Sequence, residues 1–247
     1  MQKNSAGIKT GRGQPDLPLR PRFGWGGRRE GAGRKPAPHR RVPHEQRPAL
    51  AARHPCHVTL RVAAGVPSLR SRRFVREVER SFREACERGR FRMLHYSVQT
   101  NHLHLLVEAS DARALAHGMR SLGARIARAV NRVFGRRGAV LPDRYHARIL
   151  RTPTEVRRAL AYVLLNARRH LAKLGRALPP RDWIDPASSG RWFDGWRGGI
   201  GLAHDPPPVA AARSWLARVG WRRRGLVDQG SDPARGARTG TSSSWDR

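Results

Sequence analysis

The sequence predicts an α+β fold: a ferredoxin-like βαββαβ domain with a four-stranded antiparallel sheet, an additional C-terminal helix, and disordered basic segments on either side. Short runs in which apolar and polar residues alternate indicate half-buried strands, and longer segments with apolar residues at helical spacing indicate amphipathic helices. Along the chain they follow in the order strand, helix, strand, strand, helix, strand. This order places both helices on one face of the sheet and leaves the other face free.

The first three strands and the first helix lie between residues 54 and 110. In "HPCHVTLRVAAG", Val58, Leu60 and Val62 alternate with polar neighbours, which predicts a strand. The following "SLRSRRFVREVERSFREACERGR" has the apolar spacing of a helix, with Ser68 as its N-cap. "FRMLHYSVQT" and "HLHLLVEAS" then predict two strands joined by a tight turn at Thr100.

The remaining elements follow in the same alternation. "DARALAHGMRSLGARIARAVNRVFGRRG" predicts a second helix with Asp111 as its cap, and "RYHARILR" predicts the fourth strand. The further helix is "TPTEVRRALAYVLLNARRHLAKLG", with Thr152 as cap, Pro153 in its first turn and Gly175 at its end.

Composition divides the chain into three parts. Residues 1–50 are rich in Gly, Pro and Arg and predict a flexible basic arm, residues 51–178 hold all the predicted elements, and residues 179–247 predict a Trp-containing basic extension with a disordered tail. The formal net charge is +32, nearly all of the positive charge being arginine. Such a surface gains affinity for a phosphate backbone by displacing counterions, so nucleic acid is the expected partner and a membrane is not.

Cysteine usage and the absence of apolar segments predict a cytoplasmic location. The two cysteines, Cys56 and Cys86, are too few for a disulfide framework. No stretch approaches the roughly 20 apolar residues of a membrane span, and the N-terminus lacks the apolar segment of a secretory signal. We therefore expect a protein of the cytoplasm that associates with nucleic acid.

Two histidines one residue apart stand in the third predicted strand. Side chains at i and i+2 of a strand point to the same face, so His102 and His104 are expected to point together, about 7 Å apart along the chain. Leu103, Leu105 and Val107 occupy the opposite face, where the helices pack. The pair alone is weak evidence, because 11 histidines in 247 residues give about 0.5 such pairs by chance. Metal binding and simple solvation of the two rings both fit the pattern.

The last predicted helix carries a tyrosine away from its apolar stripe. At 100° per residue, Tyr162, Asn166, Arg158 and Arg169 lie roughly opposite that stripe, and Tyr162 and Asn166 are one turn apart. A tyrosine that served only for packing is expected on the apolar stripe. Its place beside an amide and arginines favours a chemical or DNA-contacting role over that of an ordinary surface tyrosine.

Taken together, "NHLHLLVEA", "YVLLN" and the order of elements resemble a known family over about residues 54–175. The chain is similar to the single-tyrosine HUH transposases of bacterial insertion sequences, in which two histidines flank a hydrophobic residue, and in particular to the REP-associated tyrosine transposases. The resemblance implies that His102 and His104 bind a metal, Mg²⁺ or Mn²⁺, and that Tyr162 is the nucleophile. The family often has glutamine as a third ligand four residues after the tyrosine, and here that position is Asn166, whose side chain is shorter.

The resemblance further implies a reaction. Such enzymes cleave and rejoin single-stranded DNA through a 5′-phosphotyrosine intermediate, often beside a hairpin, with a divalent cation as Lewis acid. For this chain we expect the nucleic acid to contact Arg144, Tyr145, Arg158 and Arg169, with Phe91 and Tyr96 as further candidates for base stacking. The expected setting is the bacterial nucleoid, and the oligomeric state is left open between a monomer and a homodimer.

Four alternatives remain open at this point. An RRM-like sheet would bind single-stranded nucleic acid without cutting it, but "FRMLHYSV" lacks the paired aromatic signature of that family. An inactivated transposase would keep DNA binding alone. A zinc hydrolase would need a further ligand, for which Glu108 lies on the right strand and face. Finally, Tyr145 competes with Tyr162 for the role of nucleophile.

Overall fold

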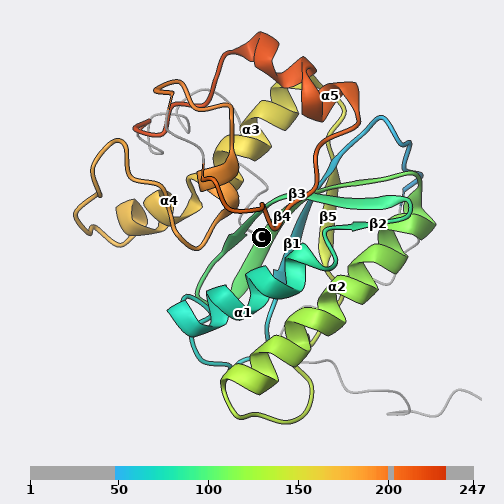
Figure 1. Ribbon diagram of the computed structural model, residues 1–247, viewed down its shortest axis with the longest axis vertical. Coiled ribbons are helices and arrows are strands. Elements are labelled where there is room, and N and C mark those ends of the chain that lie inside the picture. The colour runs from blue at the N-terminus through green and yellow to red at the C-terminus, as the bar shows by residue number, and fades with distance from the viewer. Residues whose placement is uncertain (1–47, 200–202, 232–247) are drawn as a thin grey trace, which may run out of the picture. The chain divides into compact units, whose positions relative to one another are not determined.

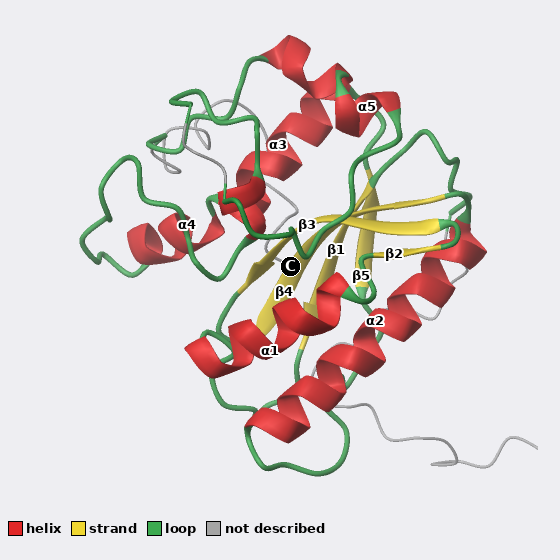
Figure 2. Ribbon diagram, in the orientation of Figure 1, coloured by secondary structure: helices red, strands yellow, loops and turns green. Residues whose placement is uncertain are grey.

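The computed structural model describes residues 48–199 and 203–231. The described residues belong to one compact unit, in which helices cover both faces of a single sheet (Figures 1 and 2). The elements in chain order are β1 (Cys56–Arg61), α1 (Arg72–Arg83), β2 (Glu87–Arg88), β3 (Phe91–Val98), β4 (His102–Ala109), α2 (Ala112–Val133), β5 (His146–Ile149), α3 (Pro153–Leu164), α4 (Asn166–Lys173), η1 (Ser189–Trp192), α5 (Trp215–Arg218) and η2 (Gly220–Arg224).

The sheet confirms the predicted ferredoxin-like topology. Its strands lie in the order β2-β3-β4-β1-β5, and all neighbours are antiparallel. The four predicted strands are β1, β3, β4 and β5, with β1 and β4 at the centre and Thr59 opposite His104. The fifth strand, β2, was not predicted, because two exposed charged residues give no apolar alternation.

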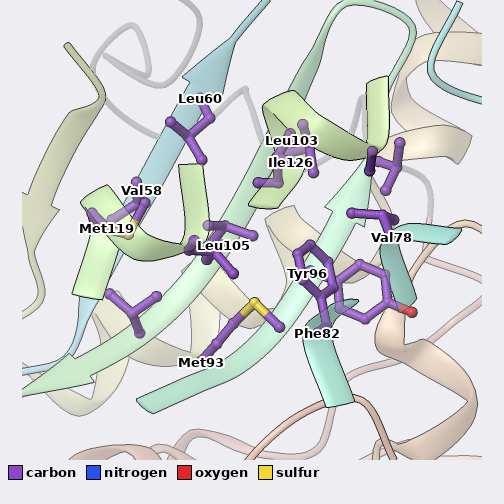
Figure 3. Packing of buried hydrophobic residues seen from close by; sticks show 14 of the residues in the cluster. Val58, Leu60, Val78, Phe82, Met93, Tyr96, Leu103, Leu105, Met119 and Ile126 are labelled. Atoms are coloured by element: carbon purple, nitrogen blue, oxygen red, sulfur yellow. The ribbon is translucent and has the colours of Figure 1, made fainter. Parts of the chain in front are cut away.

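The first layer of the core lies between the sheet and the helices α1 and α2. Figure 3 shows Leu103 and Leu105 of β4 beside Val58 and Leu60 of β1, all pointing toward this layer. All four side chains are at most 3% exposed. The predicted inward face of the third strand is therefore confirmed.

The helix caps agree with the sequence except at α1. Asp111 and Thr152 accept hydrogen bonds from backbone N–H groups in the first turns of α2 and α3, as predicted. Helix α1 is capped by Ser71, which accepts from the backbone N–H of Phe74, and not by Ser68 as predicted. The helix starts three residues later than expected, and Leu69, which lies ahead of it, is buried in the first core.

The predicted C-terminal helix is two helices. Helix α3 ends at Leu164 and α4 begins at Asn166, with Leu165 between them at φ −101° and ψ 10°. The second helix ends before Gly175, whose φ of 62° is a conformation that glycine adopts without strain. The interruption falls between Tyr162 and Asn166. The expectation that these two residues lie one turn apart on a continuous helix therefore does not hold.

The sheet face predicted to be free is largely covered. Helix α3 packs on it through an apolar stripe that includes Leu160 and Leu164, and residues of the C-terminal extension complete this second core. Phe193, Trp196 and Trp221 are its largest members, each at most 4% exposed. The aromatic residues of the extension hold it in place, and they cover most of the sheet face that was predicted to be free.

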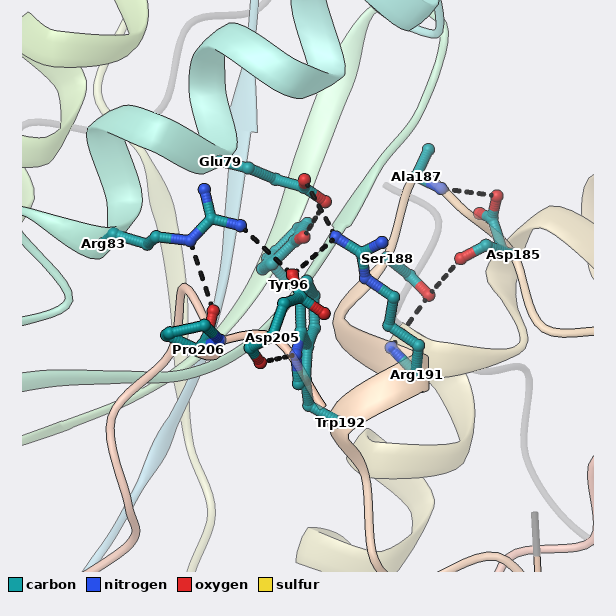
Figure 4. A network of polar contacts seen from close by, with 11 residues as sticks. Glu79, Arg83, Tyr96, Asp185, Ala187, Ser188, Arg191, Trp192, Asp205 and Pro206 are labelled. Atoms are coloured by element: carbon teal, nitrogen blue, oxygen red, sulfur yellow. Dashed lines mark hydrogen bonds and ion pairs between the residues drawn. The ribbon is translucent and has the colours of Figure 1, made fainter. Parts of the chain in front are cut away.

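Polar contacts join the extension to the other side of the domain. Figure 4 shows Glu79 of α1 accepting from the Tyr96 hydroxyl at 2.6 Å and from Arg191 at 3.2 Å. Nearby, Asp185 forms a buried ion pair with Arg70. Tyr96 is fully buried and is therefore not a base-stacking residue.

Phe91, for which core packing is the commoner expectation, is likewise not a base-stacking residue. It is 3% exposed and packs in the first core against Gly118 of α2. Because α2 covers its ring, Phe91 has no free surface on which a base can stack.

The predicted end segments fall mostly outside the described residues. Of the arm assigned to residues 1–50, only 48–50 are described, and Leu50 is 8% exposed within the first core. Residues 232–247, which include the predicted tail, lie outside as well. No helix in the described ranges is long and apolar enough to cross a membrane.

Candidate active site

The two histidines of β4 point to the same face, as predicted. The Nε2 atoms of His102 and His104 lie 3.0 Å apart, and the two rings meet edge to face. His104 is 2% exposed and His102 is half-buried. Alternation along β4 turns them away from Leu103 and Leu105 and toward α3.

The geometry of this pair fits two ligands of one divalent cation. Ligand atoms at about 2.1 Å from an ion and about 90° apart are separated by about 3.0 Å. The donors are imidazole nitrogens, and burial lowers the pKa of His104 to about 2, with the neighbouring His57 and His102 adding to the effect. His104 is therefore neutral at physiological pH, which is the form that binds a metal.

Two residues of β1 surround the other nitrogen of His104. His57 Nε2 and Thr59 Oγ1 each lie 3.2 Å from His104 Nδ1, and the rings of His57 and His104 are stacked at 5.2 Å. Burial lowers the pKa of His57 to about 3. If Nε2 of His104 holds a metal, the ring proton sits on Nδ1 and needs an acceptor, which either neighbour supplies.

Tyr162 projects from α3 onto this cluster. Its ring centre lies 5.0 Å from that of His104 and 5.4 Å from that of His57, both edge to face. The Arg169 guanidinium stands 4.8 Å from the centre of the tyrosine ring. Tyr162 is 6% exposed and packs against the histidines, so it is not an ordinary surface tyrosine.

The other predicted ligand, Asn166, is also buried. It is 2% exposed, and its Nδ2 atom has no hydrogen-bond partner among the described residues. Rotation of the amide exchanges its oxygen and nitrogen, so the same position offers the oxygen to a ligand. A buried amide without a hydrogen-bond partner destabilises a protein core, so this position is a candidate for contact with a bound ligand.

The structure separates the rival tyrosine from the histidines. Tyr145 packs partly buried against the first core, on the side of α1 and α2, whereas the histidines face α3. Arg144 is half-buried and its backbone N–H donates to Asp143. Of the four residues predicted to contact nucleic acid, Arg169 lies at the cluster and Arg158 is exposed on α3.

Glu108 does not belong to the cluster. Its carboxylate is 6% exposed and accepts hydrogen bonds from the backbone N–H groups of Arg213 and Ser214, both at 2.9 Å, ahead of α5. Within the described ranges, no three His, Cys, Asp or Glu side chains are placed to hold a metal ion. Glu108 is therefore not placed to act as the third zinc ligand that a hydrolase would need.

Three residues of the site were missed by sequence reasoning. His57 and Thr59 alternate with Val58 and Leu60, which face the first core, so the parity of β1 already assigned them to the face of the histidines. His170 lies on α4 with its ring 5.8 Å from that of His102. His170 stands eight residues after Tyr162. This spacing places the two residues on the same side of a helix only if the helix is continuous, and here it is interrupted at Leu165.

Comparison with known proteins identifies the domain. The profile of the family described as "Transposase IS200 like" matches residues 53–162, which run from three residues before β1 to the tyrosine of α3. This segment of the chain is similar to the IS200-like transposases. A search of curated proteins finds no match.

The solved structures that are similar to this chain share low sequence identity with it. A REP-associated tyrosine transposase bound to a REP hairpin is 15% identical, with a TM-score of 0.46, over 70% of this chain and 93% of that one. A bacterial tRNA(His) guanylyltransferase-like protein in complex with GTP is 14% identical, with a TM-score of 0.35, over 53% of this chain and 73% of that one.

Proposed function

We propose that this IS200-like transposase cleaves and rejoins single-stranded DNA, with Tyr162 as nucleophile and a divalent cation, Mg²⁺ or Mn²⁺, held by His102 and His104. The observation that carries the proposal is the contact of Tyr162 with His104, at 5.0 Å between ring centres, in a chain whose other candidate tyrosine faces the opposite core. Asn166 is the proposed third ligand.

The proposed chemistry is the exchange of one phosphodiester for another. The Tyr162 oxygen forms a bond to phosphorus and loses its phenolic proton to water, while the bond from phosphorus to the departing 3′ oxygen breaks and that oxygen takes up a proton from water. The products are a 5′-phosphotyrosine and a free 3′-OH. A second 3′-OH can attack the phosphotyrosine and restore a phosphodiester without ATP, because the covalent link retains the bond energy.

The residues around the tyrosine have distinct tasks in this proposal. A bound cation supplies Lewis-acid stabilisation of charge on the phosphate. Arg169, which lies over the tyrosine ring, places a fixed positive charge beside the reacting group, where it binds the scissile phosphate. His57 and Thr59 hold His104 in the tautomer whose Nε2 is free to ligate.

The burial of the site residues favours a substrate that enters at the edge of the histidine cluster over one that lies across an open sheet face. His102, Arg169 and His170 are half-buried, whereas His104 and Tyr162 lie deeper. A single strand can bring one phosphate to such a site, whereas a duplex is too wide. We propose that the substrate is single-stranded DNA next to a hairpin, as the resemblance to REP-associated tyrosine transposases suggests.

The test is a denaturing gel of the full chain with end-labelled single-stranded oligonucleotides from the sequence flanking its gene, plus Mn²⁺. We expect a covalent protein–DNA band that disappears with Tyr162→Phe, with His102→Ala and with EDTA. Tyr145→Phe is the matched control and should retain the band. A band that survives Tyr162→Phe but not Tyr145→Phe contradicts the assignment of the nucleophile, and tight binding without any adduct favours a non-catalytic binding module or an inactivated transposase.

Asn166 is tested separately. Asn166→Ala should raise the Mn²⁺ concentration needed for half-maximal adduct formation, and Asn166→Gln should restore it in part, because glutamine keeps the amide oxygen. Equal Mn²⁺ requirements for the wild type and Asn166→Ala would remove Asn166 from the ligand set.

A further inference from the structure

The outer faces of α1 and α2 enclose a basic hollow on the side of the sheet away from Tyr162. Two adjoining depressions of about 520 Å³ and 190 Å³ share Glu77, Arg80 and Arg132 in their walls. Seven arginines and two glutamates line the two depressions together. Helices α1 and α2 lie on one side of the sheet and α3 on the other (Figure 1). Because His104 contacts Tyr162 of α3, the sheet separates this hollow from the candidate active site.

The charges in the hollow are only partly neutralised. Glu77 pairs with Arg80 at 3.3 Å and with Arg132 at 2.5 Å, and Glu84 pairs with Arg125 at 2.9 Å. Four exposed arginines that line the hollow have no ion pair with any described residue: Arg72, Arg73, Arg76 and Arg128.

The concentration of arginine follows from the amphipathic pattern of the two helices. In α1 the buried residues include Phe74, Val78 and Phe82, so the arginines between them point outward. In α2 Ile126 and Ala129 are buried, and the arginines on either side of them point outward as well. Because α1 and α2 lie side by side on the sheet, the two sets of guanidinium groups meet along one surface (Figure 2).

Unpaired guanidinium groups at this density repel one another unless an anion lies between them, and their planar forks match phosphate oxygens. No aromatic side chain lines either depression, so the surface lacks the stacking platforms that hold single-stranded bases. Nor does it offer apolar residues for insertion into a membrane: among the described residues the exposed large apolar side chains, Leu174, Leu178, Trp215 and Val219, all lie outside α1 and α2.

We propose that α1 and α2 form a second DNA-binding surface, which holds the phosphate backbone of a double-stranded segment independently of its sequence. The protein would then hold a duplex on its helical face while a single strand reaches Tyr162 on the other. The binding itself does not depend on the proposed cleavage reaction, because it needs neither the metal nor the tyrosine.

The test measures the affinity of the full chain for a blunt, fluorescently labelled DNA duplex in EDTA over a series of salt concentrations. The variant replaces Arg72, Arg73, Arg76 and Arg128 with glutamine, and a second variant replaces them with lysine. The control replaces four other exposed arginines with glutamine, namely Arg88, Arg176, Arg218 and Arg224, so that the net charge is the same.

The slope of log affinity against log salt should fall by about 3.6 in the α1–α2 glutamine variant, since each of four phosphate contacts contributes about 0.9. With equal affinities extrapolated to 1 M salt, this variant should bind the duplex more weakly than the wild type at 0.1 M salt, by a factor on the order of 1,000 or more. The lysine variant should keep most of the slope, and the control should lose less than about 1. Because the four side chains are exposed and unpaired, the melting temperature should not change.

Three results would overturn the proposal. Equal losses in the α1–α2 variant and the control would show that only net charge matters, and unchanged duplex affinity would show that the surface does not bind DNA. Loss of binding to vesicles of anionic lipid, with duplex binding intact, would make it a lipid-binding surface. In none of these cases is adduct formation by Tyr162 affected, so the two proposals fail separately.

Discussion

The hydroxyl of Thr59 offers a sharp test of how His104 is held. The Nδ1 atom of His104 has two neighbours at the same distance of 3.2 Å, Thr59 Oγ1 and His57 Nε2. Thr59→Val removes one acceptor and keeps the shape of the side chain. We expect it to weaken Mn²⁺ binding, because the tautomer with the proton on Nδ1 loses a hydrogen bond.

The size of the effect follows from the number of acceptors. Loss of a hydrogen-bond partner behind a metal ligand lowers metal affinity about 10- to 100-fold. Since His57 remains as a second acceptor, Thr59→Val should lie at the low end, about tenfold or about 1.4 kcal/mol. Removing both acceptors with Thr59→Val and His57→Leu should approach about 100-fold, about 2.7 kcal/mol.

The assay is a titration of the full chain with Mn²⁺, in which the free ion is measured by electron paramagnetic resonance without DNA. Thr59→Ser keeps the hydroxyl and should bind Mn²⁺ as the wild type does. Wild-type affinity in the double variant, or an equal loss in Thr59→Ser and Thr59→Val, would refute the idea that these hydrogen bonds orient His104.

Three further predictions concern stability. Burial lowers the pKa of His95 to about 4, so His95 takes up a proton in the unfolded chain at a higher pH than in the folded one. The free energy of unfolding therefore falls as the pH falls from about 6.5 toward 4, by up to about 1.4 kcal/mol per pH unit. His95→Gln should reduce the fall in melting temperature between pH 7 and pH 5. Gly118→Ala places a Cβ 2.1 Å from the ring of Phe91 and should cost about 2 kcal/mol in a urea titration. Asp185→Asn leaves Arg70 without its buried partner, at 2.7 Å in the wild type, and should cost about 3 kcal/mol in the same assay.

The two substitutions in the core, Gly118→Ala and Asp185→Asn, each have a matched control. Gly123→Ala on the same helix meets only the end of the flexible Leu141 side chain at 3.0 Å and should be nearly neutral. Asp205→Asn breaks a pair whose carboxylate is 45% exposed and should cost less than about 1 kcal/mol. If a control variant loses as much free energy of unfolding as the variant it is matched to, burial of the substituted residue is not the cause of the loss.

Much of the fold could be predicted because alternation and helical spacing are local signals. Val58 and Leu60, and then Leu103 and Leu105, identify two central strands and the faces they bury. Two details escaped. The strand β2 has no apolar residue to reveal it, and the interruption at Leu165 has no glycine or proline to mark it.

The candidate site divides in the same way. Parity along one strand was enough to bring His102 and His104 together, and the motif around Tyr162 pointed to the helix that packs against them. Which neighbours complete the site depends on strand order: Thr59 meets His104 only because β1 pairs with β4 in that register. The same pairing brings in His57, and no local pattern encodes it.

By itself, the sequence determined the strands, the helices, the histidine pair and the basic character of the protein, since each depends on residues close together in the chain. Only the tertiary structure decided that Tyr162 contacts the histidines while Tyr145 packs on the opposite core. It also decided that the extension closes the sheet face and that α1 and α2 gather their arginines in one hollow. These features depend on which faces of distant segments meet, and burial of apolar surface across the whole chain sets that choice.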